Sequence, residues 1–308
     1  MKSIIATIPQ VCLGYGGAFT VYEGLGLLPE VELQTHETFK PSPDTKLVIG
    51  FGCNPPKIGD YKTAFVFCSP IIQCEHSGEL ELLNGKIQDV NNRVLDYLFL
   101  LHEPDAVALN VIWGENILPL FPLFNKQLPE PQFEDRKGIC CGGHIRGNKN
   151  YYNQVLGFTI SNYRKEGFFS FGLKPHLKHF SNILFKQDLN IPDYVLSNDL
   201  YYDNLRKMKL GLQVSLSESF CYFVLELSLM CVPTIVSKTI DWYAKDLRLK
   251  YCVVENPNDP CEIAEKINFI LDNENIYLDL CNASQEVAQK VLVCNLEKTK
   301  KILQNLIE

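Results

Sequence analysis

Short apolar runs alternate with longer amphipathic segments along the chain. This alternation is typical of βαβ units, in which helices join parallel strands. In the first half, four runs rich in Val, Ile and Phe predict strands. These runs cover residues 3–8, 46–50, 63–67 and 106–112. Helices are expected after Gly17 and at 90–101, so this half predicts an α/β domain.

The second half repeats the pattern. The expected strands cover residues 138–141, 167–171, 193–196, 210–215, 233–237 and 251–254. The expected helices cover residues 150–163, 199–207, 219–230 and 260–272, followed by an amphipathic helix from 285 to the end. The helix at 260–272 has a clear start, because Asp259 suits an N-cap and Pro260 suits the first helical position. A second α/β domain follows.

A proline-rich segment separates the two halves. Four prolines fall between residues 118 and 133, which indicates a linker. A chain of 308 residues also suits two domains at about 150 residues each. We expect an N-terminal domain at 1–130, a C-terminal domain at 131–285 and a final helix at 286–308 that braces the first domain.

The charge of the chain argues against a general attraction to nucleic acid or anionic lipid. Thirty-six acidic residues against 29 basic ones give a net charge of −7. One local exception is the stretch 164–186, where five Lys/Arg are interleaved with five Phe. Such a mixture suits a phosphorylated acceptor, a lipid headgroup or a nucleic acid. A core strand and helix with a solvated face is the simpler interpretation.

Cysteine usage and hydropathy point to a cytoplasmic protein with reduced thiols. The twelve cysteines form no Cys-x-x-Cys pair, and no histidine has convincing zinc spacing, so no metal site is expected. The N-terminus lacks the pattern of a secretion signal. Two apolar stretches, 108–124 and 219–237, contain Glu115 and Glu226 respectively. A charge at mid-membrane is costly, so we interpret both as buried segments.

The most informative segment is 211–237, which predicts a strand, a polar loop, a helix and a second strand. The loop Ser217-Glu218-Ser219 would present a helix N-terminus at the carboxyl end of a parallel strand, a common place for phosphate. Glu226 follows Glu218 by eight residues, or ~12 Å along a helix, so the two would contact different parts of an extended ligand. Simple helix capping explains the loop equally well.

A resemblance favours the functional interpretation. Glu218 and Glu226 resemble the Glu-x7-Glu signature of retaining glycosyltransferases of family 4, which have the two-domain GT-B fold. The run Cys231-Val-Pro-Thr-Ile-Val is similar to the "Gly-Val-Pro-Val-Ile" segment of that family. Cys231 replaces the usual glycine, which leaves the geometry of that turn open.

Two further segments are similar to the same family. The run Ile139-Cys-Cys-Gly-Gly-His-Ile-Arg-Gly-Asn-Lys-Asn resembles a variant found in glycosyltransferases of phages and other viruses. By this match Arg146 and Lys149 would hold the donor diphosphate, and Gly143 would let the backbone approach it. In the first domain, Gly16 and Gly17 end a glycine loop that resembles the one facing the diphosphate.

The resemblance implies an α/β GT-B enzyme with two Rossmann-like domains facing across a cleft. It would transfer a sugar from a nucleotide-sugar to an acceptor hydroxyl with retention and without a metal or other cofactor. Glu226 would bind the ribose and Glu218 the sugar. The donor phosphates would meet the loop around Ser217, with backbone N–H groups at Ser219 and Phe220.

The resemblance does not identify the acceptor. A glycan or another small hydroxyl-bearing molecule is our first expectation. An enzyme acting on hydroxymethylated bases of viral DNA is an alternative that the net charge disfavours. A protein that binds nucleotide-sugars without turnover is another alternative, which the combination of Arg146, Lys149, Glu218 and Glu226 argues against.

Overall fold

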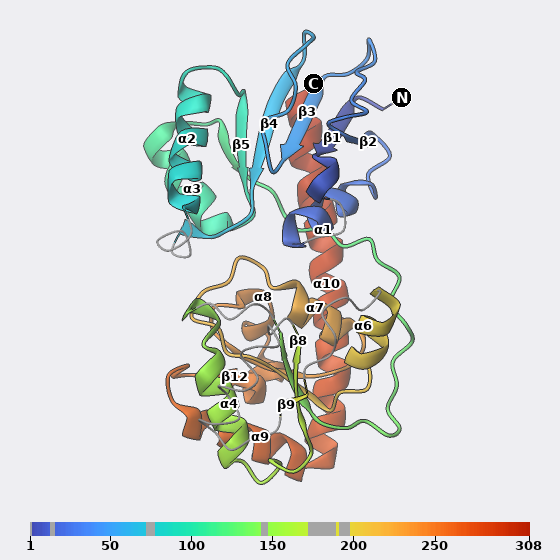
Figure 1. Cartoon of the computed structure of the whole chain (residues 1–308), viewed down its shortest axis with the longest axis vertical. Coiled ribbons are helices and arrows are strands. Elements are labelled where there is room, and N and C mark those ends of the chain that lie inside the picture. The colour runs from blue at the N-terminus through green and yellow to red at the C-terminus, as the bar shows by residue number, and fades with distance from the viewer. Residues whose placement is uncertain (1, 13–15, 72–77, 143–146, 172–188, 191–197) are drawn as a thin grey trace. The chain divides into compact units, whose positions relative to one another are not determined.

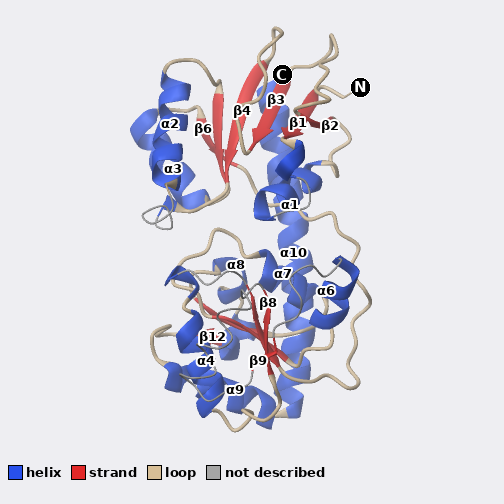
Figure 2. Cartoon of the chain, in the orientation of Figure 1, coloured by secondary structure: helices blue, strands red, loops and turns tan. Residues whose placement is uncertain are grey.

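The computed structural model describes residues 2–12, 16–71, 78–142, 147–171, 189–190 and 198–308 (Figure 1). The chain divides into two compact units. The first contains Met1–Lys126 together with Leu292–Glu308, and the second contains Gln127–Val291. The boundary at Lys126 lies within the proline-rich segment. Helices and strands occur in both units (Figure 2).

The first unit is built on a parallel sheet of six strands in the order β2-β1-β3-β4-β5-β6. The strands are β1 (Ile4–Ile8), β2 (Val31–Thr35), β3 (Leu47–Phe51), β4 (Lys62–Phe67), β5 (Tyr97–Leu100) and β6 (Ile117–Pro119). The helices are α1 (Gly16–Leu25), α2 (Glu79–Asn91) and α3 (Glu103–Trp113), with a 3-10 turn at Gln10–Cys12. β1 and β3 are buried along their whole length, as expected for central strands of a covered parallel sheet.

Two expectations for the first unit are wrong. The run at 106–112 was expected as a strand, but it lies in α3, where Pro104 and the acidic Glu103 and Asp105 favour a helix start. The helix expected at 90–101 is absent, because α2 ends at Asn91 and the next apolar run forms β5. In α3 only Ala106 and Leu109 are buried, whereas Val111 is 82% exposed, so its Val and Ile residues do not mark a strand.

The second unit also has a parallel sheet of six strands, in the order β12-β11-β10-β7-β8-β9. The strands are β7 (Ile139–Gly142), β8 (Phe168–Phe171), β9 (Leu189–Asn190), β10 (Leu210–Gln213), β11 (Thr234–Ser237) and β12 (Val253–Val254). The helices are α4 (Tyr151–Ile160), α6 (Asn198–Leu205), α7 (Tyr222–Leu229), α8 (Asp241–Ala244), α9 (Pro260–Asp272) and α10 (Glu274–Ile307), with 3-10 turns η3 (Gly147–Lys149) and η4 (Leu247–Cys252). Two separate apolar clusters cover this sheet, one including residues of α4 and α9 and the other residues of α6 and α7.

Several elements of the second unit agree with the sequence. α9 has the expected bounds, and the Asp259 carboxylate caps it by accepting from the backbone N–H groups of Cys261 and Glu262. The strand expected at 193–196 lies outside the described residues. In the described part of 164–186, Phe168 is fully buried in β8, as the core interpretation expects. None of the helices in the described ranges is long and apolar enough to cross a membrane.

The last helix is longer than expected and belongs to both units. It starts at Glu274 rather than near 285, and its end, from Leu292, packs within the first unit. There the Asn295 Nδ2 donates to the carbonyl of Pro122 at 2.9 Å, and the Thr299 hydroxyl donates to that of Phe121 at 3.1 Å. Both hydrogen bonds are buried, and they satisfy backbone carbonyls of a segment without secondary structure.

Candidate functional site

Glu218 lies in the loop that follows β10, at the carboxyl end of the second sheet. Its side chain is nearly buried, with 6% exposure. One oxygen, Oε1, accepts from three donors: the Lys149 ammonium at 2.5 Å, the Gln213 amide at 2.8 Å and the Ser215 hydroxyl at 2.8 Å. A buried carboxylate is costly without a paired charge and hydrogen bonds, and this site supplies both.

Lys149 reaches Glu218 because η3 is tied to the loop after β10. The backbone N–H of Leu216 donates to the Asn148 carbonyl at 2.7 Å. The Asn150 side chain donates to the Val214 carbonyl at 3.0 Å. Asn150 adopts a left-handed conformation with φ of 51°, which turns the chain from η3 into α4. Two segments that are distant in sequence therefore bring an ammonium and a carboxylate together.

Glu226 lies on α7 and is 7% exposed. Its two oxygens accept from two adjacent tyrosines of α6. The Tyr201 hydroxyl donates to Oε2 and the Tyr202 hydroxyl donates to Oε1, each at 3.0 Å. Burial and the neighbouring carboxylate raise the pKa of Tyr201 well above its usual value, so its hydroxyl keeps the proton it donates. The carboxylate within this apolar helix thus has specific polar partners.

The helix that carries Glu226 begins later than expected. α7 starts at Tyr222, and Cys221 precedes it with φ of 67°. Ser219 and Phe220, which open the expected helix at 219–230, therefore lie in the loop before the helix, together with Ser217, which is expected there. Glu226 is one turn into the helix rather than two, so the ~12 Å estimate, which assumed a helix from Glu218 onward, does not apply.

Aromatic contacts hold the loop before α7. The Phe220 ring stacks on the Trp242 ring, with 5.6 Å between centroids, and the Trp242 indole N–H donates to the Phe220 carbonyl at 2.6 Å. At the end of β7, a Cβ added to Gly142 would lie 2.4 Å from the Phe223 ring. Only a glycine allows α7 to pack so closely over that strand end.

The other predicted site residues fall into two groups. Arg146 and Gly143 lie outside the described residues. Gly16 and Gly17 open α1 in the first unit, and residues 13–15 before them lie outside the described residues. Within the described ranges, no three His, Cys, Asp or Glu side chains are grouped so that they could hold a metal ion.

Sequence reasoning missed four partners of the two glutamates. They are Gln213, Ser215, Tyr201 and Tyr202. Gln213 could have been identified from the sequence, since a polar residue within the buried apolar run of β10 needs a hydrogen-bond partner. The tyrosines gave no such signal, because aromatic residues in an amphipathic helix usually mark packing.

The first unit contains a polar cluster that sequence reasoning also missed. Thr7, His36 and Cys53 lie on or just after β1, β2 and β3, at the carboxyl edge of the sheet. The His36 ring has Nε2 3.2 Å from the Thr7 hydroxyl and Nδ1 3.3 Å from the Cys53 sulfur. Burial lowers the pKa of His36, which favours the neutral imidazole. Parallel sheets bind ligands at this edge, which makes the cluster a candidate contact for a second substrate.

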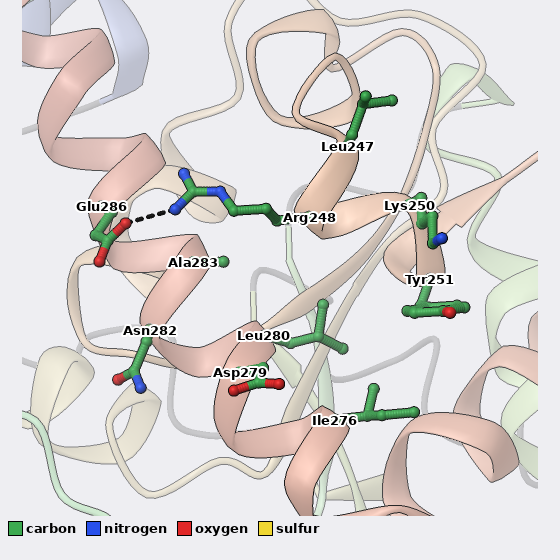
Figure 3. Close-up of a pocket in the computed structure, with 10 residues that line it drawn as sticks. All are labelled: Leu247, Arg248, Lys250, Tyr251, Ile276, Asp279, Leu280, Asn282, Ala283 and Glu286. Carbon is green, nitrogen blue, oxygen red and sulfur yellow. Dashed lines mark hydrogen bonds and ion pairs between the residues drawn. The ribbon is translucent and has the colours of Figure 1, made fainter.

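A cavity of about 450 Å³ lies elsewhere in the second unit, between η4 and the first half of α10 (Figure 3). Since η4 precedes β12, the cavity is near the amino end of that strand and not at the carboxyl end where Glu218 lies. On one wall Arg248 donates to Asp246 at 3.0 Å and to Glu286 at 2.5 Å. Arg248 therefore joins η4 to α10 through its ion pair with Glu286.

Comparison with known proteins gives a clear answer for the fold alone. No family model matches the sequence, and no curated protein matches it. Solved structures do match. The sucrose-phosphate synthase of Thermosynechococcus elongatus has a TM-score of 0.71 at 12% identity, with 99% of each chain covered. Anabaena HepE in complex with UDP-glucose has a TM-score of 0.70 at 12% identity, covering 98% of this chain and 99% of the other.

TarM is a further similar structure. It has a TM-score of 0.67 at 14% identity, and the match covers 87% of this chain but 56% of TarM. Together with the two parallel sheets, these likenesses show that the chain has the α/β GT-B fold of glycosyltransferases. At such low sequence identity these likenesses establish the fold of the chain but not the reaction that it catalyses.

Proposed function

We propose that the chain is a retaining glycosyltransferase that moves a sugar from a nucleotide-sugar to an acceptor hydroxyl without a metal ion. One observation carries the proposal. Two buried glutamates with matching motif spacing follow the central β10 strand: Glu218 lies in the loop at its carboxyl end, where a lysine pairs with it, and Glu226 lies on α7, where two tyrosines donate to it. The GT-B neighbours support a nucleotide-sugar donor, since the HepE structure contains UDP-glucose.

In this proposal Glu226 binds the ribose of the donor. A carboxylate accepts hydrogen bonds from both hydroxyls of a vicinal diol, and burial strengthens those bonds. The loop of Ser217, Ser219 and Phe220 lies just before α7 and contributes backbone N–H groups to the phosphates. The family resemblance also assigns Gly16 and Gly17, at the start of α1, to donor binding.

Glu218 and Lys149 serve the reacting part of the donor. Glu218 accepts from hydroxyls of the transferred sugar, and Lys149 neutralises the diphosphate. Lys149 has three N–H donors, so it can bind a phosphate oxygen and keep a bond to Glu218. By the family resemblance Arg146 adds a second positive charge and Gly143 lets the backbone approach, although both are outside the described residues.

The chemistry then needs little from side chains beyond positioning and charge. As the bond between the sugar and the diphosphate breaks, negative charge grows on the leaving phosphate, and Lys149 stabilises it. The departing phosphate takes the proton of the acceptor hydroxyl on the same face, and the new bond forms there with retention. Holding donor and acceptor in this geometry lowers the entropic part of the barrier.

The acceptor in our proposal is a glycan or another small hydroxyl-bearing molecule. Transfer to a modified base of duplex DNA is less favoured, because a net charge of −7 opposes a phosphate-binding face. A strong dependence of acceptor binding on salt would favour DNA instead. Donor binding without turnover on any acceptor would favour a binding protein.

A thermal-shift screen with nucleoside diphosphates and nucleotide-sugars tests the proposal. A ligand at 100 times its Kd adds about 2.7 kcal/mol to the stability of the folded state, so the true donor raises the melting temperature clearly. We then expect sugar release or transfer from that donor to persist in excess EDTA. Activity that is lost in EDTA and restored by magnesium or manganese would contradict the metal-independent mechanism.

A further inference from the structure

Helix α3 is apolar on its outward face as well as on the face that packs against the sheet. It packs on β5 and β6, at one edge of the sheet of the first unit (Figure 1). Ala106 and Leu109 are buried there, in one apolar cluster with residues of α2 and β5. Four large apolar side chains of α3 are 48% to 82% exposed: Val107, Val111, Ile112 and Trp113. A helix that is apolar all round is normally buried all round, so the outward face of α3 needs a cover.

Most of these exposed residues form one continuous stripe, which we call the α3 stripe. Val107 and Val111 are four residues apart, as are Ala108 and Ile112, so the four side chains are neighbours on the helix surface. From 106 to 114 the sequence contains no charged residue. Single exposed apolar residues are common on protein surfaces, but a contiguous apolar patch is typical of a surface that contacts another molecule.

The charges around the α3 stripe narrow the choice of partner. Glu103 lies at its N-terminal end, and the Lys298 ammonium is 3.8 Å from the Glu103 carboxylate. Glu115 follows the C-terminal end; it is exposed, and among the described residues no ion pair includes it. Helices that lie on membranes carry Lys and Arg beside their apolar face, whereas α3 contains two acidic residues and no basic one. An anionic lipid surface or a nucleic acid therefore fits poorly.

We propose that the α3 stripe is a dimer interface, in which α3 packs antiparallel against α3 of a second copy of this chain. Around a two-fold axis, Val107 of each copy faces Val111 of the other, so the contact is apolar on both sides. These small side chains allow the distance of about 8–10 Å that separates the axes of packed helices. An antiparallel pair also places each helix N-terminus beside the C-terminus of the other, which suits the helix dipoles.

The charges at the two ends of the α3 stripe are complementary in this arrangement. The start of one α3 lies beside the end of the other, so Glu103 of one copy is at the level of Glu115 of the second copy. Lys298, next to Glu103, is then close to both carboxylates and offsets their repulsion. A parallel pair would instead place Glu115 beside Glu115, with no ammonium near.

The size of the α3 stripe predicts a weak dimer. α3 has 11 residues and is therefore ~16 Å long. One face of such a helix buries less than the about 800 Å² per partner that is typical of stable complexes. We therefore expect a reversible dimer that dissociates in the micromolar range.

Sedimentation equilibrium of the full chain, from about 1 µM to about 100 µM, tests the interface in the range where such a small contact dissociates. We expect a monomer–dimer equilibrium in the parent. Val111→Glu places a charge opposite Val107 of the second copy and should weaken association at least about tenfold. The control is Leu247→Glu, which adds the same charge at a residue of the second unit that is 83% exposed, and it should dimerise like the parent. Both positions are exposed, so both variants should fold.

A charge reversal tests the antiparallel arrangement. Lys298→Glu should weaken the dimer several-fold, and adding Glu115→Lys to it should restore much of the association. No recovery in the double variant would contradict this arrangement. A parent that stays monomeric throughout, or a Val111→Glu variant that dimerises equally well, would overturn the interface itself. Binding of a monomeric parent to phosphatidylcholine vesicles, abolished by Val111→Glu, would also overturn it and identify a lipid surface as the cover.

Discussion

The two buried glutamates of the second unit are held by different kinds of partner. Glu218 has an ammonium, an amide and a hydroxyl on a single oxygen, whereas Glu226 has one phenol hydroxyl on each oxygen. The sequence predicted both carboxylates from their spacing and from a family resemblance. It did not predict their partners, because Lys149 was assigned only to the diphosphate and the tyrosines come from a separate helix. Side-chain pairing of this kind depends on tertiary packing.

His36 in the first unit leads to a pH prediction. Burial lowers its pKa below the usual value of 6.5, with Glu37 opposing the shift. The unfolded chain therefore binds the proton first as the pH falls, so protonation favours unfolding. The free energy of unfolding should decrease as the pH falls below about 6.5, until the folded-state pKa is passed.

The variant His36→Asn isolates this effect. It removes the titrating ring beside Thr7 and Cys53, and other groups that titrate in the same range remain in both proteins. Urea unfolding between about pH 7 and about pH 5, followed by circular dichroism, should show a shallower loss of stability in the variant. Parallel pH profiles for parent and variant would show that His36 has the same pKa folded and unfolded.

At the scale of single elements, α9 provides a stability prediction. The Asp259 carboxylate accepts from the backbone N–H of Cys261 at 2.8 Å and of Glu262 at 3.4 Å. In Asp259→Ala these two N–H groups can bond only to water, so the free energy of unfolding should fall by about 1 kcal/mol. Denaturant unfolding measures the loss, with Glu265→Ala, an exposed change on the same helix, as the control. Equal stability of the two variants would mean that the cap contributes nothing.

Elements were predictable where local signals agreed with one another. α9 has an N-cap, a proline at its start and a buried face of Ile263, Ile267 and Ile270, so its bounds follow from the sequence. The sequence predicts a strand at 106–112 because the Val and Ile residues there favour one. The structure has α3 instead, since Pro104 and the acidic first turn favour a helix. The start of α7 was placed too early, because Cys221 adopts a positive φ that no residue pattern announces.

At the scale of the whole molecule, the alternating pattern predicted α/β units with parallel sheets, and the family resemblance implied the GT-B fold. The two parallel sheets and the structural likenesses confirm both. α10 was harder to predict. Its amphipathic pattern continues from Glu274 across the boundary at Leu292, so no sequence signal marks where it passes from one unit to the other. Contacts such as those of Asn295 and Thr299 decide that assignment, and they link residues more than 170 positions apart.

The central claim is that the second unit binds a nucleotide-sugar through two glutamates with separate duties. Calorimetric titration of the best-binding nucleoside diphosphate into the parent, Glu226→Gln and Glu218→Gln tests it most directly, with folding checked by circular dichroism. Loss of a charged hydrogen bond costs about 1.5–3 kcal/mol, so Glu226→Gln should weaken binding about ten- to a hundredfold. Glu218→Gln should bind the nucleotide nearly as the parent does, because its partner is the sugar. Parent-like binding by both folded variants would contradict the account.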